Sequence, residues 1–336
     1  MSNQEVYEAI TRRMIKALEA GTIPWQKPWT AAAGGPPMRM SNGEPYRGVN
    51  TLLLGWEAQE RGYSSPWWGT YDEIARRSGM EKRTNSRGGS FWVSPDGSPR
   101  GVRRGEKGTK IVFSKTVIKT ETDPVTGVRA GRPVYLMHMW SVFNADQAEQ
   151  LPARYYPARE GGEPVAGIRD AQEVLDKYLA NGGPTLRHVP GDRAHYQAGP
   201  DRITLPEREQ FTSPEAYYGA AFHEAGHSTG HPSRLDREGI AHFDHFGTER
   251  YAKEELVAQI TSAMLQAETG IETPGEWDRS AAYVKNWLGA LREDPKLVPQ
   301  AAAAAQRAVD LITEPQRQAE RDDQPEAEKL AEREAA

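Results

Sequence analysis

Apolar side chains recur at the spacing of helix turns near the start of the chain. Val6, Ile10, Met14 and Leu18 are each four residues apart, so in a helix they would share one face. The pattern predicts a helix over residues 4–20. A glycine follows directly, and glycine is the residue that most often terminates a helix.

Two shorter helices and a long loop are predicted next. Asn50 and Thr70 are suitable N-caps for helices near residues 50–61 and 70–78, each of which carries apolar side chains. Residues 83–105 are rich in Gly, Ser, Pro and Arg, which predicts a long flexible loop.

The β-rich part of the first half consists of two segments, 109–120 and 133–143. Both are rich in β-branched and aromatic residues, which favour strands. The turn-forming residues at 123–127 separate them, so we expect the two strands to pair as a hairpin.

The second half has a different pattern. A helix is predicted near 167–181, followed by short strands near 184–188, 193–197 and 202–205 and then mainly by helices up to residue 313. The order of elements predicts an α+β protein, with an N-terminal α/β domain and a mostly helical C-terminal domain that holds a small sheet.

Composition suggests where the domains meet. Repeated Pro, Gly and Arg predict a linker at 151–166, which leaves domains at 1–150 and 167–313. Residues 314–336 are highly charged and predict a disordered tail.

The strongest chemical signal is the H-E-x-x-H motif His223-Glu224-Ala225-Gly226-His227. Ser213 and Pro214 are good residues for a helix start, so the motif is expected to lie on a helix. Residues four apart share a helix face, and His223 and His227 could therefore bind one ion. Glu224 is then placed to act as a general base on a water molecule at that ion.

A zinc site of this type needs a third protein ligand. A further histidine three residues after Gly230 is excluded, because position 233 is serine. Glu255 is favoured, since the same face of its helix carries the small or polar residues Ala258, Gln259 and Ser262. Glu254 is the alternative, and a third possibility is a loop residue, namely His242, Asp244 or His245. Zinc suits two imidazoles and one carboxylate, and manganese or another divalent ion can substitute.

The chain contains no cysteine, which excludes disulfides, cysteine-based zinc fingers and cysteine nucleophiles. No apolar run reaches membrane-spanning length, and the first residues lack the pattern of a signal peptide. We therefore expect a soluble cytoplasmic protein that does not contact a membrane.

Charge and tryptophan are distributed unevenly. The net charge of −5 combines +6 over residues 1–150 with −11 over the remainder. Seven of the nine tryptophans lie in the basic half, at positions 25, 29, 56, 67, 68, 92 and 140. Basic grooves follow phosphates and aromatic rings stack on exposed bases, so this half is predicted to bind single-stranded DNA. Trp56, on an apolar helix, is instead expected to pack in the core.

Several separate blocks resemble one known family. The segments 18–29, 45–50, 104–108 and 142–147 are similar to the N-terminal domain of the ArdC-type antirestriction proteins, and the segments 222–231 and 251–258 resemble the metallopeptidase-like domain that follows it. The resemblance implies a protein of plasmids or phages that binds single-stranded DNA and protects incoming DNA from host restriction. Gln259 departs from the family pattern, which usually has glutamate there.

The motifs and the resemblance together indicate candidate site residues. The metal ligands are His223, His227 and Glu255, and the catalytic residue is Glu224. The DNA-binding candidates are the aromatic and polar residues Trp25, Lys27, Trp29, Arg47, Asn50, Arg103, Arg104, Lys107 and Lys110.

Three functions remain open from the sequence. The first is an antirestriction protein that coats single-stranded DNA and carries a zincin-like site. The second is an active metallopeptidase that its DNA-binding half directs to a DNA-associated protein. The third is a non-enzymatic binding protein in which the metal stabilises the fold.

Overall fold

The computed structural model describes residues 2–21, 23, 35–122, 129–156, 171–241, 249–271 and 281–314. Helices are combined with small sheets whose strand pairings are mostly antiparallel, which confirms the predicted α+β class. No helix among these residues is both long enough and apolar enough to cross a membrane.

The first half contains most of the strands. In chain order its elements are α1 (Asn3–Glu19), β1 (Met38–Arg39), α2 (Val49–Arg61), β2 (Trp67–Gly69), α3 (Tyr71–Arg77), β3 (Glu81–Thr84), β4 (Ser90–Val93), β5 (Gly101–Val102), β6 (Thr109–Thr122), β7 (Arg129–Asn144), the 3-10 turn η2 (Ala145–Gln147), β8 (Ala148–Glu149) and the 3-10 turn η3 (Ala153–Tyr155). The three predicted helices and the predicted strand pair are confirmed.

The second half is mainly helical. Its elements are α4 (Ala171–Ala180), β9 (Thr185–Val189), β10 (His195–Gln197), β11 (Arg202–Pro206), the 3-10 turn η4 (Arg208–Gln210), α5 (Pro214–Ser228), α6 (Glu238–Ala241), α7 (Glu249–Glu268), α8 (Ala281–Glu293) and α9 (Leu297–Thr313). The three predicted strands form one sheet in the order β10-β11-β9. The predicted tail lies outside the described residues from 315 onward.

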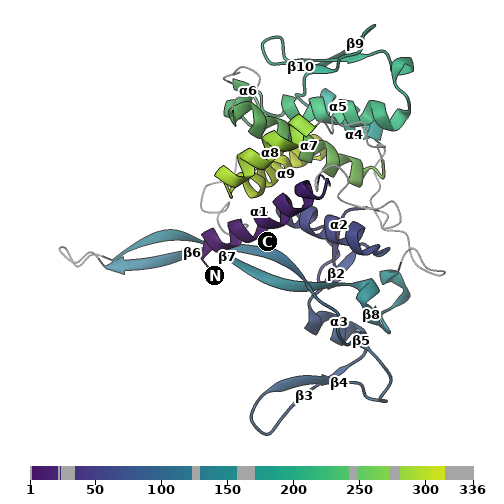
Figure 1. The fold of residues 1–336 in the computed structure, drawn as a ribbon, viewed down its shortest axis with the longest axis vertical. Helices are drawn as coiled ribbons and strands as arrows, with labels where there is room; N and C mark the ends of the chain where they lie inside the picture. Colours follow the sequence, from purple (N-terminus) through teal and green to yellow (C-terminus); the bar gives the residue numbers. More distant parts are fainter. Residues whose placement is uncertain are drawn as a thin grey trace.

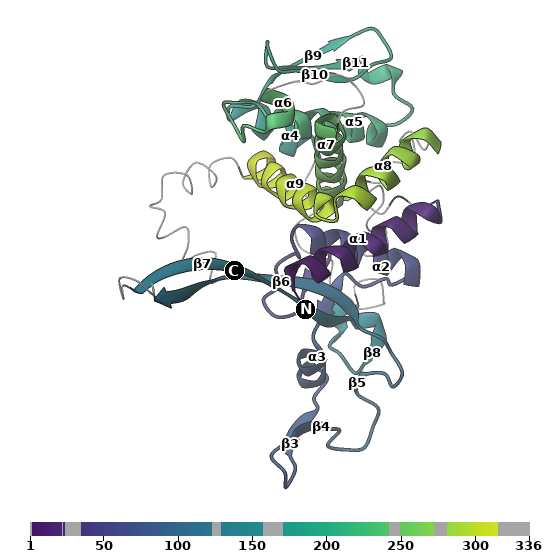
Figure 2. The same cartoon turned by 60° about the vertical axis from the view of Figure 1, so that its left-hand side comes forward.

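The molecule is elongated, with its layers stacked along the long axis (Figures 1 and 2). The sheet of β9, β10 and β11 lies at one end, next to α4 and α5. Helices α7, α8 and α9 follow, then α1 and α2. Strands β6 and β7 form a long ribbon that projects beyond α1 and α2, and the β3–β4 hairpin lies at the far end.

One large core joins the two halves of the chain. Val6, Ile10 and Met14 of α1 belong to the same buried cluster as Ala301 and Ala305 of α9. Polar contacts cross at the same level, because the Thr11 hydroxyl donates to the Pro295 carbonyl at 2.7 Å and the Gly48 N–H donates to Gln306 at 2.9 Å. The two halves are therefore distinct in sequence but share a core.

The described beginning of the expected linker is packed. Leu151, Tyr155 and Tyr156 are buried against Met40 and Ile74 in a second core cluster. The remainder of the expected linker, from residue 157, lies outside the described residues.

The prediction of a loop at 83–105 is wrong where the chain forms β3 and β4. Strands β3 and β4 pair as an antiparallel hairpin, with Glu81 opposite Val93 and Thr84 opposite Ser90. All four residues of β3 are exposed, so neither face shows the alternation of polar and apolar residues by which strands are predicted. The Asn85 side chain closes the turn by accepting from the Gly89 N–H at 2.8 Å.

The N-cap predicted at Asn50 is also wrong, since Gly48 occupies that position. The Asn50 amide instead donates to the Val112 carbonyl at 2.7 Å and accepts from the Val112 N–H at 2.8 Å. Strand β6 is the outer strand of its sheet, in the order β1-β2-β7-β6. Asn50 therefore satisfies the free edge of β6 at the point where α2 crosses it.

Candidate metal centre

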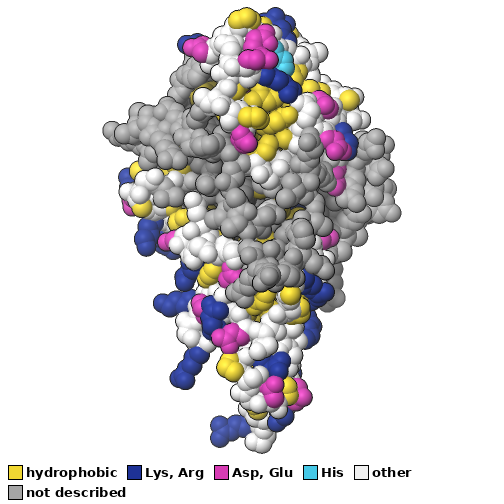
Figure 3. Space-filling view, turned by 90° about the vertical axis from the view of Figure 1, so that its right-hand side faces the viewer, with side chains coloured by type: hydrophobic (Ala, Val, Ile, Leu, Met, Phe, Trp, Pro, Cys, Tyr) yellow, Lys and Arg dark blue, Asp and Glu magenta, His cyan; other side chains and the backbone are white. Residues whose placement is uncertain are grey.

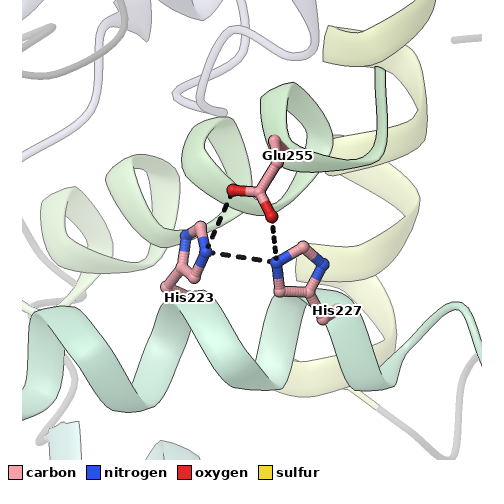
Figure 4. Close-up of side chains that lie close together, drawn as sticks. All are labelled: His223, His227 and Glu255. Atoms are coloured by element: carbon pink, nitrogen blue, oxygen red, sulfur yellow. Dashed lines mark hydrogen bonds and ion pairs between the residues drawn. The ribbon is translucent and has the colours of Figure 1, made fainter. Parts of the chain in front are cut away.

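The H-E-x-x-H motif lies near the end of α5. The Ser213 hydroxyl accepts from the Ala216 N–H at 3.2 Å and Pro214 takes the first helical position, which confirms the predicted helix start. From this helix, the side chains of His223 and His227 point toward Glu255 on α7 (Figure 4).

The three side chains form a compact triangle of donor atoms. The Nε2 atoms of His223 and His227 are 3.1 Å apart, and the Glu255 carboxylate oxygens lie 3.6 Å from the first and 3.3 Å from the second. Tetrahedral ligands at zinc bond lengths stand roughly 3.3–3.6 Å from one another. The triangle therefore fits a divalent ion, and no other group of three His, Asp or Glu side chains among the described residues has this geometry.

Small residues allow α7 to come this close. A Cβ added to Gly226 would lie 3.1 Å from the Cα of Ala258, and the Ser262 hydroxyl donates to the Gly219 carbonyl at 2.9 Å. Two helices can approach in this way only where their facing side chains are small. This confirms the prediction that the face of α7 carrying Ala258 and Ser262 leaves room for the motif helix.

Glu254 lies beside the triangle but faces a different partner. Its two oxygens accept from Arg237, Oε1 from an Nη at 2.6 Å and Oε2 from Nε at 2.9 Å. One of them also lies 3.4 Å from Nδ1 of His227, the ring nitrogen that does not face Glu255. A carboxylate in this position orients a metal-binding imidazole and fixes its tautomer.

Arg237 is itself anchored to the motif helix. It donates to the Gly226 carbonyl at 2.7 Å and to the Thr229 hydroxyl at 2.6 Å. The end of α5, Glu254 and His227 are thus held in one hydrogen-bonded network. Loop residues His242, Asp244 and His245, the third possibility for a ligand, lie outside the described residues.

The surroundings shift the titration of each group. Burial, followed by the neighbouring His227, lowers the pKa of His223 to about 3, so this imidazole stays neutral, as a ligand must be. Burial also opposes charge on His227, but Glu254 and Glu255 outweigh it and raise the pKa of His227 to about 10. Burial favours the neutral form of Glu255, and the contact with His227 overcomes this and lowers the pKa of Glu255 to about 2.

Glu224 is buried beside the triangle. Burial raises the pKa of its carboxyl group to about 7, and the neighbouring His227 and a hydrogen bond from the Tyr196 backbone on β10 oppose the shift only in part. A general base works best when its pKa lies near the working pH. The environment of Glu224 therefore suits proton transfer at neutral pH.

Two contacts of the site were not predicted from the sequence. The side chain of Tyr251 hydrogen-bonds to Glu255 and lowers the pKa of that carboxylate. Its position one turn before Glu255 is a signal that helix spacing offers. No comparable signal identifies Arg237, because its contacts depend on how the turns after α5 fold back onto the end of that helix.

Each half of the chain matches a known protein family. Residues 4–150 match the model of the N-terminal domain of the anti-restriction factor ArdC, and residues 173–304 match that of a zincin-like metallopeptidase. The metal-free crystal structure of the antirestriction protein ArdC from plasmid R388 is 38% identical, with a TM-score of 0.68, over 92% of this chain and 96% of that one. The chain belongs to the ArdC antirestriction family.

The Mn(II)-bound structure of ArdC from R388 is similar as well, with a TM-score of 0.66 and 36% identity over 92% of this chain. Uncharacterized protein y4eC of Sinorhizobium fredii is 30% identical over 95% of both chains. A DNA primase TraC of Escherichia coli is 38% identical over 322 residues, but the chain spans only 27% of that primase.

Only part of the set of residues predicted to bind DNA lies among the described residues of this ArdC-family chain. Trp25, Lys27 and Trp29 lie outside the described residues. Arg47 forms an ion pair with Asp310. The amide of Asn50 is engaged by the backbone of Val112, as described above.

The remaining candidates surround the start of β6. Arg103 pairs with Glu106 at 2.7 Å, and Lys110 donates to the Ser141 hydroxyl at 2.8 Å. Arg104 and Lys107 are exposed. Trp56 is buried, which confirms that this ring serves packing.

Proposed function

We propose that this protein binds single-stranded DNA, carries a zinc-dependent peptidase-type centre, and protects incoming plasmid or phage DNA from host restriction. The observation that carries the metal-dependent part is the triangle of His223, His227 and Glu255 with Glu224 buried beside it. Two imidazoles and a carboxylate form the ligand set of glutamate zincins, which leaves a fourth position for water or substrate.

Each residue has a role in peptide hydrolysis. His223, His227 and Glu255 would hold the ion, which, when bound, acts as a Lewis acid toward a peptide carbonyl and lowers the pKa of a water molecule. The Glu224 carboxylate accepts the proton of the attacking water and then donates it to the leaving amine nitrogen. Glu254 and Arg237 hold His227 in the orientation that this set of ligands requires.

Charge and exposed aromatic rings support the DNA-binding part. Residues 76–119 hold 12 basic and 3 acidic residues. Lys and Arg side chains stand out along the lower part of the face in Figure 3, toward the end of the molecule that carries β3 and β4. Two large aromatic side chains of the first half, Phe113 and Trp140, are also about half exposed. Such a surface suits a polyanion with unpaired bases.

A second candidate function is cleavage of a DNA-associated protein. The buried Glu224, with a pKa near 7, favours a catalytic centre over an ion that only stabilises the fold. Cleavage of a protein requires the Glu224 carboxylate as a base, whereas coating of DNA does not. Substitution of Glu224 therefore separates the two functions.

The test compares three proteins: wild type, Glu224→Gln, and the double variant His223→Ala/His227→Ala. Wild type and Glu224→Gln should each hold about one divalent ion per chain by elemental analysis, and the double variant should hold none, because two of three ligands are removed. Full ion occupancy in the double variant would rule out this ligand set.

The same three proteins then separate the functions. If the centre cleaves a protein, Glu224→Gln should abolish cleavage of a casein or DNA-bound protein probe while it keeps the ion. If protection of DNA rests on coating, Glu224→Gln should protect transferred DNA from restriction as well as wild type does. Loss of protection in Glu224→Gln would instead support the peptidase as the protective activity.

A further inference from the structure

We infer that bases of single-stranded DNA stack on one face of the β6–β7 ribbon, on the rings of Trp140 and Phe113. The inference rests on the proposed binding of single-stranded DNA and adds the surface on which it occurs. Neither ring was among the predicted DNA-binding residues. We call this surface the ribbon face and define it by Phe113, Lys115, His138 and Trp140.

The strand register places these residues on one side of the ribbon. Phe113 lies opposite His138, Ile111 opposite Trp140, and Lys115 opposite Leu136. Directly opposite residues in an antiparallel pair point to the same side, and successive residues alternate. Phe113 and Trp140 are therefore diagonal neighbours, with side chains close enough to act together.

The two faces of the ribbon have different surroundings. Val112 and Met137, which point to the other side, are buried in the large core beneath α1 and α2. On the ribbon face Phe113 is 46% exposed and Trp140 is 56% exposed. These rings belong to none of the core clusters formed by the described residues. Large aromatic rings left in water contribute little to folding and mark a binding surface.

The charge of the ribbon favours a nucleic acid over an apolar protein partner. The sequences of β6 and β7 contain five basic residues and one acidic residue, namely Lys110, Lys115, Lys119, Arg129 and Arg132 against Glu121. Lys115 is exposed on the ribbon face, two residues beyond Phe113. A single strand can bind such a surface through two contacts at the same time. Its phosphates pair with the cations while its bases stack on the rings.

The shape of the surface favours a single strand over a duplex. Exposed aromatic side chains on a sheet stack on unpaired bases, as in sheet-based single-strand binders. The bases of a duplex are already stacked on one another and present only their edges in the grooves. The ribbon face thus suits a strand whose bases are free.

The test measures binding of a fluorescent oligothymidine to the full chain at low salt. Trp140→Ala and Phe113→Ala should each weaken binding by about 5-fold to about 150-fold, the range for loss of one stacked base. Trp140→Phe should retain most of the affinity, since a ring remains. A duplex of the same length should bind more weakly than the single strand and should respond little to these substitutions.

Phe91→Ala is the matched control, because Phe91 is 45% exposed but lies on β4 of the other hairpin. Its affinity for the oligonucleotide should equal that of wild type. Equal losses in Phe91→Ala and Trp140→Ala, or wild-type affinity in both ribbon variants, would overturn the assignment to the ribbon face. Wild-type protein that binds no oligonucleotide would instead contradict the proposed function itself.

A second measurement does not depend on the ring substitutions. Lys115→Gln should reduce the slope of log affinity against log salt by about 0.7, the value for one lost phosphate contact on a single strand. If the ring variants melt at lower temperature than wild type, this slope decides the question. An unchanged slope in Lys115→Gln would then reject the ribbon face.

Discussion

Glu254 and Glu255 are adjacent on α7 but contact different partners. Glu255 faces Nε2 of both motif histidines, whereas Glu254 faces Nδ1 of His227 and Arg237. Consecutive residues on a helix point about 100° apart. One carboxylate can therefore complete a set of ligands while its neighbour orients a ligand from behind.

We predict different effects for the two carboxylates on metal affinity. Glu255→Ala should reduce affinity most, because it removes a donor atom. Glu254→Gln should reduce affinity by about 10-fold to about 100-fold, the usual effect of losing a partner behind a ligand. Titration of the apo protein with zinc and manganese measures both. Glu238→Gln, which changes an exposed carboxylate on α6, is the control. A larger effect in Glu254→Gln than in Glu255→Ala would exchange the two roles.

At the residue scale, the sequence predicted those parts of the metal site that depend only on spacing along one helix. The positions of His223 and His227 follow from helical periodicity alone. The choice between Glu254 and Glu255 requires the rotation of α7 relative to α5, and spacing does not provide it. The contacts of Arg237 with Gly226, Thr229 and Glu254 could not be predicted either. They depend on how the chain turns back after α5 and on where α7 lies beside it, and no spacing in the sequence provides this.

At the scale of elements, strands were predicted where one face is buried. Strands β6 and β7 carry buried Val112 and Met137 on one face, and the sequence predicted their pairing. Strands β3 and β4 project into solvent and were predicted as a loop, because no apolar alternation marks them. The role of Asn50 at the edge of β6 was also missed, since a suitable N-cap residue suggested a simpler function.

Asn50 provides a prediction at this scale. Asn50→Ala removes both hydrogen bonds to Val112 and leaves two backbone groups at the edge of β6 without this partner. The free energy of unfolding should fall by about 1–3 kcal/mol, measured by urea denaturation. Oligonucleotide affinity should be unchanged under conditions where the variant is folded. Unchanged stability together with reduced affinity would return Asn50 to the DNA-binding surface.

The substitution Asn42→Ala is the control for Asn50→Ala. Asn42 is exposed, and the hydrogen bonds described for its side chain go only to Glu44 in the same turn. Its loss should change stability by no more than about 0.5 kcal/mol. The difference between the two variants then isolates the contribution of the strand edge from that of a polar side chain in a turn.

At the scale of the whole molecule, the metal centre and the ribbon lie on opposite sides of one core. The motif helix belongs to the second half and the ribbon to the first, and α1, α2, α7 and α9 fill the space between them (Figures 1 and 2). The change in composition along the chain predicts two units but contains no information on whether they share a core. Removal of the second half would expose the apolar face of α1, so DNA binding is best measured on the full chain.

The shared core predicts that binding at one end stabilises the other. Seven of the nine tryptophans lie within residues 1–150, whereas the proposed ligands lie at 223–255. Zinc at about 100 times its dissociation constant should add about 2.7 kcal/mol to the stability of the folded state. If the halves unfold together, the melting transition seen by tryptophan fluorescence should rise by a few degrees, as the calorimetric transition does. The variant His223→Ala/His227→Ala should show neither shift. A calorimetric shift without a fluorescence shift would mean that the halves unfold separately, and the core that joins α1 to α9 would then not couple them.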